Sequence, residues 1–341
     1  MKFKAAIAYE VDKPLIVEEV EVDKPLDVGQ VLIKLHVSGI CGAQLLEIKG
    51  HKGNAKFMPH MMGHEGSGTV VEIGPGVTTL KPDDSVVAHW MVGEGIEATF
   101  PTYKCKGIRI GGGKVTTFAE YAIISENRLT KVSSNTNKDL GALLGCGLTT
   151  GLGVVNNECD VKFGESLMVI GCGGVGLNLI QGAKMHCCYP IYAVDINNNK
   201  KDIAMKLGAT HFINLSESKF SNHLQDVDII TDTVGSAELI SEAISLLSNE
   251  GRYIMVGHLP PNKTLEIPNA VDMFFGKGKL LRATQGGKTC PQEDIPRYIK
   301  LAEAGLIDID PLITHRTSLH NINDALDLIR QSQAGRILID L

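Results

Sequence analysis

A glycine-rich turn between a short apolar strand and a helix constrains this chain more than any other feature. Leu167-Met168-Val169-Ile170 is typical of a buried strand, and the turn begins at the next residue. In such a unit the glycines permit the tight turn, the approach of a pyrophosphate and the close packing of helix on strand. An ordinary tight turn is the alternative, but this context predicts dinucleotide binding. The residues expected to hold the phosphates are Gly171, Gly173, Gly174, Val175 and Gly176.

An acidic residue at the end of the next apolar strand indicates which dinucleotide is bound. Asp195 follows Gly171 by 24 positions, a spacing that suits a carboxylate on the adenosine ribose hydroxyls. It would repel a 2′-phosphate, and no arginine follows it closely. Lys200 and Lys201 could bind a 2′-phosphate, but the acid favours NAD(H) over NADP(H).

Length and charge narrow the class of protein. A chain of 341 residues predicts two domains, and a net charge of −6 argues against nucleic acid or an anionic membrane as partner. Its apolar runs are too short to span a bilayer, and its N-terminus does not read as a signal peptide. Eight cysteines without a repeating spacing suit a reducing compartment. We therefore expect a cytoplasmic enzyme with a small-molecule substrate.

The N-terminal part is rich in strands. Alternating apolar residues predict strands at 4–8, 15–17 and 31–37. Strand and helix signals alternate from about 149 to 282, as parallel βαβ units require. A helix is expected at 291–305 and a closing strand at 336–341.

The segment 59–77 resembles a known signature. Gly63-His64-Glu65, followed by glycines at 68 and 74, is similar to the signature of zinc alcohol dehydrogenases. With the nucleotide unit downstream, the chain resembles a zinc-dependent medium-chain dehydrogenase/reductase of the polyol, sugar and threonine dehydrogenase-like branch. The resemblance implies hydride transfer between NAD and an alcohol or carbonyl compound.

The resemblance also implies an α/β architecture in two domains. A GroES-like β-barrel catalytic domain, split between 1–148 and 283–341, would flank a doubly wound parallel-sheet Rossmann domain at 149–282. Relatives pair through edge strands of the nucleotide domain, so we expect a homodimer or homotetramer.

The same resemblance implies a catalytic zinc held by Cys41, His64 and Cys146. Two thiolates and one imidazole leave a fourth, open position. Glu65 is expected either as a displaceable ligand and outer carboxylate or as a buried acid paired elsewhere in the barrel.

Two positions depart from the usual proton relay. Many relatives carry a hydroxyl residue and then an acid at the positions of Ala43 and Gln44. We therefore hypothesise that a substrate hydroxyl or another side chain, acting through water, moves the proton. The candidate side chains are Glu47, His51, Glu65 and His89.

A second departure concerns a structural zinc. Relatives hold it with four closely spaced cysteines, but only Cys105 lies between positions 89 and 117 here. We expect no structural zinc and an irregular lobe at 93–113.

Further residues are assigned by resemblance alone. Lys200 is expected to bond the adenosine ribose, and Thr150 and Gly257 to approach the nicotinamide side.

Three residues, Gln44, His89 and Trp90, are expected to line the substrate pocket, with Glu47 and His51 nearby. This mixed polarity favours a polar secondary alcohol of sugar or polyol type. An S-(hydroxymethyl)glutathione-type alcohol, a metal-free quinone or enoyl reductase, and a non-catalytic NAD-binding protein are the alternatives.

Overall fold

The computed structural model describes residues 1–22, 24–220, 224–260 and 262–341. Its internal contacts divide the chain into two compact units. The first comprises residues 1–147, 290–305 and 313–341, and the second comprises 148–289 and 306–312. The domain limits expected from the sequence stay a prediction. In the described part of the chain, no helix has both the length and the apolar character that a membrane crossing requires.

A closed barrel of five strands forms one part of the first unit. Phe3, Ala5 and Ile7 alternate along its first strand and are buried, because every second side chain of a strand faces the same side. Tyr103 and Ile110 join them in the same apolar cluster. In barrel order the strands are β1 (Lys2–Ala8), β2 (Ile16–Glu21), β7 (Thr102–Cys105), β8 (Ile108–Gly111) and β4 (His60–Met61).

The hairpin of β7 and β8 corrects one expectation. The lobe expected to be irregular at 93–113 contains two antiparallel strands, and its prediction is wrong for residues 102–111. Lys106 and Gly107 both have positive φ, at 49° and 80°, which matches the twist of a tight two-residue hairpin turn.

A seven-stranded sheet forms the rest of the β-structure in the first unit. Its last strand pairs antiparallel with β3, with Ile337 opposite Ile40, so the end of the chain is built into the first unit. The path of the sheet is β10 (Leu129–Val132), β6 (Ser85–Ala88), β5 (Gly66–Ile73), β3 (Gln30–Ile40), β18 (Arg336–Asp340) and β17 (Ile313–Ser318), with β9 (Tyr121–Ser125) also paired to β3.

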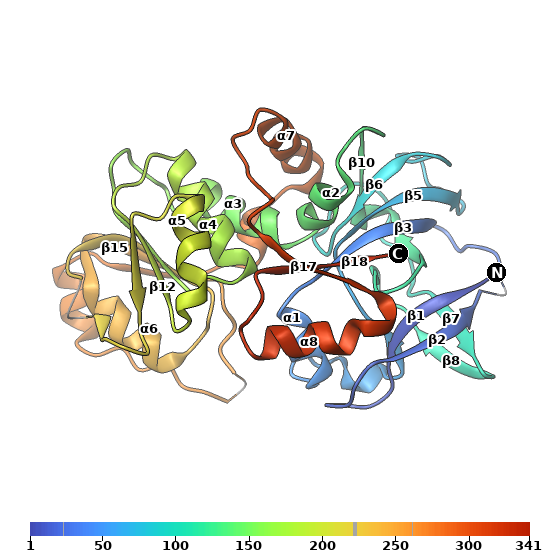
Figure 1. Ribbon diagram of the computed structural model, residues 1–341, viewed down its shortest axis with the longest axis horizontal. Coiled ribbons are helices and arrows are strands. Elements are labelled where there is room, and N and C mark those ends of the chain that lie inside the picture. The colour runs from blue at the N-terminus through green and yellow to red at the C-terminus, as the bar shows by residue number, and fades with distance from the viewer. Residues whose placement is uncertain (23, 221–223, 261) are drawn as a thin grey trace. The chain divides into compact units, whose positions relative to one another are not determined.

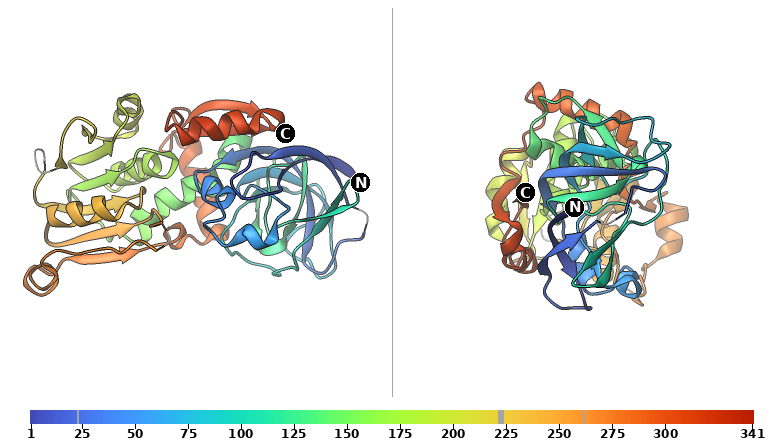
Figure 2. Two further views of the ribbon diagram at one scale, coloured as in Figure 1. Left: turned by 90° about the horizontal axis from the view of Figure 1, so that it is seen from below. Right: turned by 90° about the vertical axis from the view of Figure 1, so that its right-hand side faces the viewer.

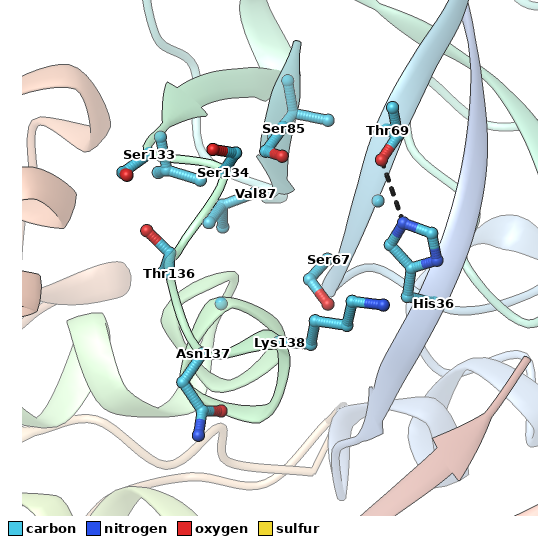
Figure 3. Close-up of a pocket in the computed structure, with 14 residues that line it drawn as sticks. His36, Ser67, Thr69, Ser85, Val87, Ser133, Ser134, Thr136, Asn137 and Lys138 are labelled. Carbon is cyan, nitrogen blue, oxygen red and sulfur yellow. Dashed lines mark hydrogen bonds between the residues drawn. The ribbon is translucent and has the colours of Figure 1, made fainter. Parts of the chain in front are cut away.

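The described part of the first unit also contains α-helices of 6 to 13 residues. The red helix α8 lies beside the last strands in both views of Figure 2, and its Ile322 and Leu326 share an apolar cluster with Ile337. α2 packs on β3, β5 and β6, and a pocket lies beside it (Figure 3). The helices are α1 (Ala43–Ile48), α2 (Lys138–Leu144), α7 (Pro291–Glu303) and α8 (Ile322–Arg330).

A parallel six-stranded sheet forms the centre of the second unit (Figure 1). The chain builds outward from β11 to one edge and then returns to the other side of β11, so the end of this strand is a topological switch point. Such points bind ligands in open α/β sheets. The strand order is β13 (His211–Asn214), β12 (Ile191–Asp195), β11 (Leu167–Ile170), β14 (Val227–Asp232), β15 (Leu247–Met255) and β16 (Leu280–Ala283).

Helices of the second unit pack on this sheet. α4 follows the glycine turn and contacts β11, β12 and α5. The strands carry near-continuous apolar runs, as expected for a sheet covered on both faces. The helices are α3 (Gly147–Asn157), which starts at the last residue of the first unit, α4 (Gly174–Met185), α5 (Lys201–Leu207) and α6 (Ala237–Ala243).

Short 3₁₀ or π segments complete the described elements. They are η1 (Asn54–Phe57), η2 (Glu126–Arg128), η3 (Asn198–Lys200), η5 (Ile244–Leu246), η6 (Asp272–Gly276), η7 (Gly286–Lys288) and η8 (Leu319–Asn321).

Candidate metal centre and nucleotide site

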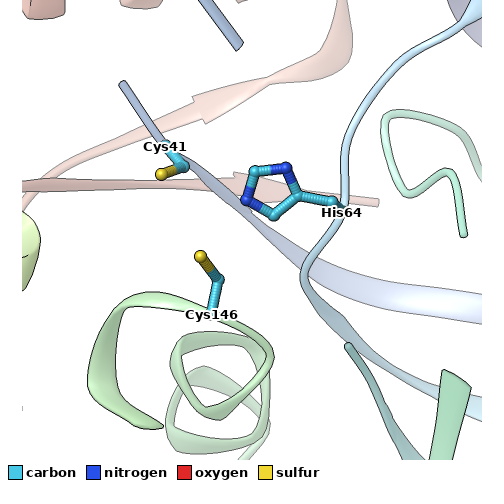
Figure 4. Close-up of side chains that lie close together, drawn as sticks. All are labelled: Cys41, His64 and Cys146. Carbon is cyan, nitrogen blue, oxygen red and sulfur yellow. The ribbon is translucent and has the colours of Figure 1, made fainter. Parts of the chain in front are cut away.

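Three side chains from distant parts of the first unit meet in its interior (Figure 4). Cys41 follows β3, His64 lies between β4 and β5, and Cys146 lies between α2 and α3. A ligand atom from each lies within 4.8 Å of the others, and all three residues are buried. Gly145 brings the third residue close, because a Cβ there would lie 2.3 Å from the Ala88 carbonyl oxygen.

The chemistry of these three residues fits a zinc ion. His64 Nε2 is buried and has no hydrogen-bond partner, so it is available as a ligand. The hydrogen bond with Cys146 lowers the pKa of the Cys41 thiol well below its ordinary value. Burial opposes a charge on His64, but Cys41, Glu65 and Glu47 outweigh it and raise the pKa of the imidazole. Two sulfurs and one imidazole nitrogen are ligands that zinc prefers.

The glycine turn of the second unit is a tight strand-to-helix turn with open space beside it. Gly171 has a φ of 92°, which favours glycine, and nothing lies within 4 Å of the place where a Cβ of Gly173 would stand. The N–H of Cys172 donates to Asp195 Oδ2 at 2.7 Å, so the acid at the end of β12 lies against the turn. Lys200 is buried, and this burial lowers its pKa while Asp195 opposes the shift.

Comparison with known proteins settles the family. The alcohol dehydrogenase GroES-like domain matches residues 27–134, and the zinc-binding dehydrogenase domain matches residues 174–304. S-(hydroxymethyl)glutathione dehydrogenase of Escherichia coli O139:H28 is 31% identical over 375 aligned residues, which cover 99% of this chain and 100% of that protein. The chain belongs to the zinc-binding alcohol dehydrogenase family.

Solved structures agree with this alcohol dehydrogenase fold. An alcohol dehydrogenase zinc-binding domain protein from Burkholderia ambifaria has a TM-score of 0.92 and 26% identity, covering 100% of this chain and 99% of that chain. Benzyl alcohol dehydrogenase of Acinetobacter calcoaceticus has a TM-score of 0.88 and 24% identity, with the same coverage. The expected GroES-like and Rossmann-type architecture is confirmed.

Membership also confirms the expected reaction class. This alcohol dehydrogenase is an NAD-dependent oxidoreductase that interconverts alcohols and carbonyl compounds. The family implies zinc and NAD as cofactors, and the Cys41–His64–Cys146 site fits a catalytic zinc.

A buried ion pair lies next to the zinc ligands of this dehydrogenase. Glu65 Oε1 pairs with Arg336, which β18 brings from the far end of the chain. Glu65 Oε2 accepts a 3.3 Å hydrogen bond from the N–H of Gly147, the residue after Cys146. In this structure Glu65 is therefore paired with an arginine and does not join the three clustered ligand atoms. No local motif surrounds Arg336, so its place beside the ligands was not predictable from the sequence.

Gln44 and Glu47 both face the outer nitrogen of His64. Nε2 of Gln44 contacts His64 Nδ1, and a carboxylate oxygen of Glu47 lies 4.0 Å from the same nitrogen. Zinc binding through Nε2 requires the proton on Nδ1, which then needs an acceptor. Gln44 Oε1 already accepts from the Cys41 N–H at 2.9 Å. In the described structure Nδ1 contacts the amide nitrogen of Gln44. The Glu47 carboxylate, 4.0 Å away, is the nearby negative charge but lies beyond hydrogen-bond distance, and it also lies 3.5 Å from Lys52 Nζ.

The other predicted proton carriers do not contact the outer nitrogen of His64 in the described structure. His51 is exposed, one turn beyond α1, and Ala43 offers no hydroxyl. His89 is fully buried, its Nδ1 lies 2.9 Å from the Met91 carbonyl oxygen, and its Nε2 lies 3.0 Å from Thr130 Oγ1. Both ring nitrogens of His89 are therefore engaged in the core, which counts against its expected place in a pocket wall or a proton relay.

The buried position of His89 predicts a pH effect on stability. Burial lowers its pKa from 6.5 to about 4, so the unfolded chain takes up this proton at a higher pH than the native protein does. The free energy of unfolding should therefore fall by up to about 3 kcal/mol between pH 7 and pH 4 through this group alone. Urea unfolding followed by the fluorescence of Trp90, the only tryptophan, measures this loss. In His89→Gln the free energy of unfolding should fall by about that much less between pH 7 and pH 4. The same fall in the variant as in the wild type would contradict the prediction.

The remaining predicted residues are placed as follows. Trp90 is half-buried, and its indole Nε1 has no partner in the described structure. Thr150 is buried in α3, and its hydroxyl likewise has no partner in the described structure. Gly257 donates its N–H to the Asp232 carbonyl at 2.8 Å. Its missing Cβ lets it approach Gly235, whose nitrogen would otherwise lie 2.5 Å away.

Asp232, at the end of a central strand of the parallel sheet, was not predicted as a site residue. It ends β14, next to β11, and its carboxylate accepts from the N–H groups of Val234 and Gly235. Burial raises its pKa, and these two donors oppose the shift. The sequence does contain a signal for it: Asp232 ends an apolar run and is followed by Gly235, as Asp195 ends the run of β12.

Proposed function

We propose that this alcohol dehydrogenase holds one catalytic zinc per chain, at Cys41, His64 and Cys146, and no structural zinc. The convergence of two Sγ atoms and the unpartnered His64 Nε2 within 4.8 Å is the observation that carries the proposal. The segment where relatives carry four cysteines holds only Cys105. Cys105 Sγ donates to Glu18 at 2.9 Å, and Glu18 also pairs with Tyr9 and Lys106. This polar cluster supports the hairpin in place of a metal.

The chain's residues have distinct parts in the proposed reaction. Cys41, His64 and Cys146 would hold the zinc ion, which would supply a Lewis acid for the substrate oxygen and so lower the pKa of an alcohol. Glu47, 4.0 Å from His64 Nδ1, is a negative charge that favours the tautomer with its proton on Nδ1 and with Nε2 free as a ligand. Glu65 is a buried counter-charge to Arg336 next to the site, and its service as a displaceable ligand stays a prediction.

NAD is proposed to bind along the glycine turn of the second unit. The N–H groups at the start of α4 receive the pyrophosphate, and Gly173 allows it to approach. Asp195 accepts from the ribose hydroxyls, with Lys200 beside it, and Gly171, Gly174, Val175 and Gly176 shape the turn. Thr150 and Gly257 are proposed to approach the nicotinamide side.

The proton is proposed to leave through Glu47 or His51 by way of water, since Ala43 carries no hydroxyl. Both residues lie on or next to α1, and Glu47 is within reach of His64. Single substitutions Glu47→Gln and His51→Gln should each be tested for a change in the pH–rate profile.

A polar secondary alcohol of sugar or polyol type is the proposed substrate. Gln44 and His89 are committed to hydrogen bonds inside the first unit, so this proposal now depends on Glu47, His51 and Trp90. S-(hydroxymethyl)glutathione is the second candidate, because a relative named for that activity is 31% identical over the full length. A metal-free reductase and a non-catalytic protein are disfavoured by the intact triad of zinc ligands.

We further propose a homodimer or homotetramer in the cytoplasm. β16 lies at the edge of the parallel sheet with exposed side chains, and such an edge offers unpaired backbone groups to a second copy. The eight cysteines are free, which suits a reducing compartment.

Zinc content in the wild type and in Cys41→Ser tests the proposed function. We expect about one zinc per chain in the wild type. Loss of a thiolate should remove most of it and lower NAD-dependent alcohol oxidation at least about 10³-fold. Cys187→Ser, at an exposed cysteine of the second unit, is the matched control and should keep both. A wild type purified without chelators that holds no zinc would overturn the proposal, and two zinc ions per chain would overturn its one-metal form.

A substrate panel then separates the two candidates. NADH formation should be followed with polyols, simple secondary alcohols, benzyl alcohol and formaldehyde plus glutathione. Higher kcat/KM with polyols supports the first candidate, and higher kcat/KM with the glutathione adduct supports the second.

A further inference from the structure

A polar pocket of about 210 Å³ lies in the first unit, beside α2 (Figure 3). We propose that it binds a phosphate-class oxyanion, either inorganic phosphate or the phosphoryl group of a small metabolite. The proposal does not depend on the zinc or NAD sites. The pocket is formed by β3, β5, β6, the loop after β10 and the start of α2.

The lining of the pocket combines hydroxyl groups with positive charge. Lys138 and His36 are its ionisable residues, and no carboxylate is among the fourteen described residues that line it. Phosphate groups are recognised by cations together with hydroxyl and N–H donors. Six side chains of the lining supply hydroxyls: Ser67, Thr69, Ser85, Ser133, Ser134 and Thr136.

Two of these hydroxyls lack partners inside the protein. Ser67 is 6% exposed, and its Oγ is buried without a hydrogen bond. Thr136 Oγ1 is also buried without a hydrogen-bond partner in the described structure. A buried hydroxyl without a partner costs roughly 1–3 kcal/mol, so a ligand that accepts from it recovers part of that cost. Figure 3 shows the Ser67 hydroxyl turned toward the side of the pocket where Lys138 lies.

The charge of Lys138 is not neutralised by a neighbour. None of the ion pairs in the described part of the chain includes it, whereas the two nearby acids have other partners. Asp139 pairs with Arg316 at 2.7 Å, and Asp84 pairs with Lys131 at 2.7 Å. Burial, then the charges of Lys138 and Lys34, lower the pKa of His36, whose Nε2 lies 2.9 Å from Thr69 Oγ1. The lowered pKa leaves His36 neutral near pH 7, so an anion in the pocket would meet one cation, Lys138, that has no ion pair in the described structure.

The pocket shares its walls with segments that carry zinc ligands. Ser67 follows His64 by three residues on β5, and Gly141 lies in α2, which leads to Cys146. A Cβ at Gly141 would lie 3.0 Å from Ser67 Cβ, so the two walls are in close contact. Variants of the pocket must therefore keep their zinc content and thermal midpoint to be informative. Lys138→Met changes an exposed residue, and Ser67→Ala removes a single oxygen, so both should meet this condition.

Isothermal titration of the full-length protein with inorganic phosphate tests the proposal. It is done at fixed ionic strength and with saturating NAD, so that the nucleotide turn is occupied. We expect one saturable site, weakened at least about tenfold by Lys138→Met and about three- to tenfold by Ser67→Ala. Lys162→Met makes the same change of charge at an exposed lysine of the second unit, and it should bind phosphate like the wild type.

Other outcomes separate the sources or overturn the proposal. Glycerol 3-phosphate, added as a model phosphomonoester, should compete if the pocket takes phosphorylated metabolites, and should fail to compete if it takes the free ion alone. Equal binding by Lys138→Met and Lys162→Met overturns the proposal. So does the absence of saturable binding, and so does binding that occurs only without NAD, since that phosphate would occupy the nucleotide turn.

Discussion

Arg336→Met is expected to destabilise the first unit by about 3–5 kcal/mol, because it leaves the Glu65 carboxylate buried without its counter-charge. Glu65 is fully buried and Arg336 is 2% exposed. Burial already raises the pKa of Glu65, and the arginine is the cation that opposes this shift most strongly. Urea unfolding followed by Trp90 fluorescence, which reports on the first unit, measures the loss.

Two further variants separate loss of the pair from loss of packing. The double variant Glu65→Gln/Arg336→Met removes both charges and should return to within about 2 kcal/mol of the wild type. Arg330→Met breaks an exposed pair with Asp327 in α8 and should cost no more than about 0.5 kcal/mol. Similar losses in the single and the double variant would show that the arginine matters through its volume rather than its charge.

Gly176→Ala is expected to destabilise the second unit by at least about 3 kcal/mol. A Cβ at this position would lie 1.8 Å from the Gly171 carbonyl oxygen. A backbone oxygen at the end of β11 cannot move away without distorting the turn itself. Far-UV circular dichroism during urea unfolding reports on the helices of both units, and Trp90 fluorescence, which reports on the first unit, separates the loss in the second.

Gly173→Ala is the matched variant in the same turn. Nothing lies within 4 Å of its added Cβ, and its φ of −81° suits alanine, so its stability should fall by about 1 kcal/mol or less. The methyl group would stand where the pyrophosphate approaches, and NAD binding measured by calorimetry should weaken at least about tenfold. Equal stability losses in the two variants, or unchanged NAD binding in Gly173→Ala, would contradict this division of roles.

The nucleotide unit was predictable because its determinants are local. The strand 167–170, the glycine turn and Asp195 lie within one short βαβ unit, and hydrophobic run length and glycine spacing specify it. The structure has the expected order: α4 (Gly174–Met185) follows the turn directly, and β12 (Ile191–Asp195) ends on the expected acid. The signature at His64 and Glu65 was readable for the same reason.

Features that depend on contacts between distant segments were much harder to predict. His89 looked like a pocket residue, but its partner Thr130 is 41 positions away and draws it into the core. The hairpin at 102–111 was missed because the surrounding glycines suggested irregular structure, whereas Tyr103 and Ile110 are buried in the barrel.

The sequence by itself determined the class of this protein: a strand–turn–helix that suits NAD, a zinc alcohol dehydrogenase signature, and a segment without the four cysteines of a second zinc. Only the tertiary structure decided which groups meet. It brings Arg336 to Glu65 across 271 positions, draws the ligand atoms of Cys41, His64 and Cys146 together, and leaves the Ser67 hydroxyl without a partner. The physical reason is that such contacts depend on strand pairing between distant segments, and neither periodicity nor the spacing of a motif records that pairing.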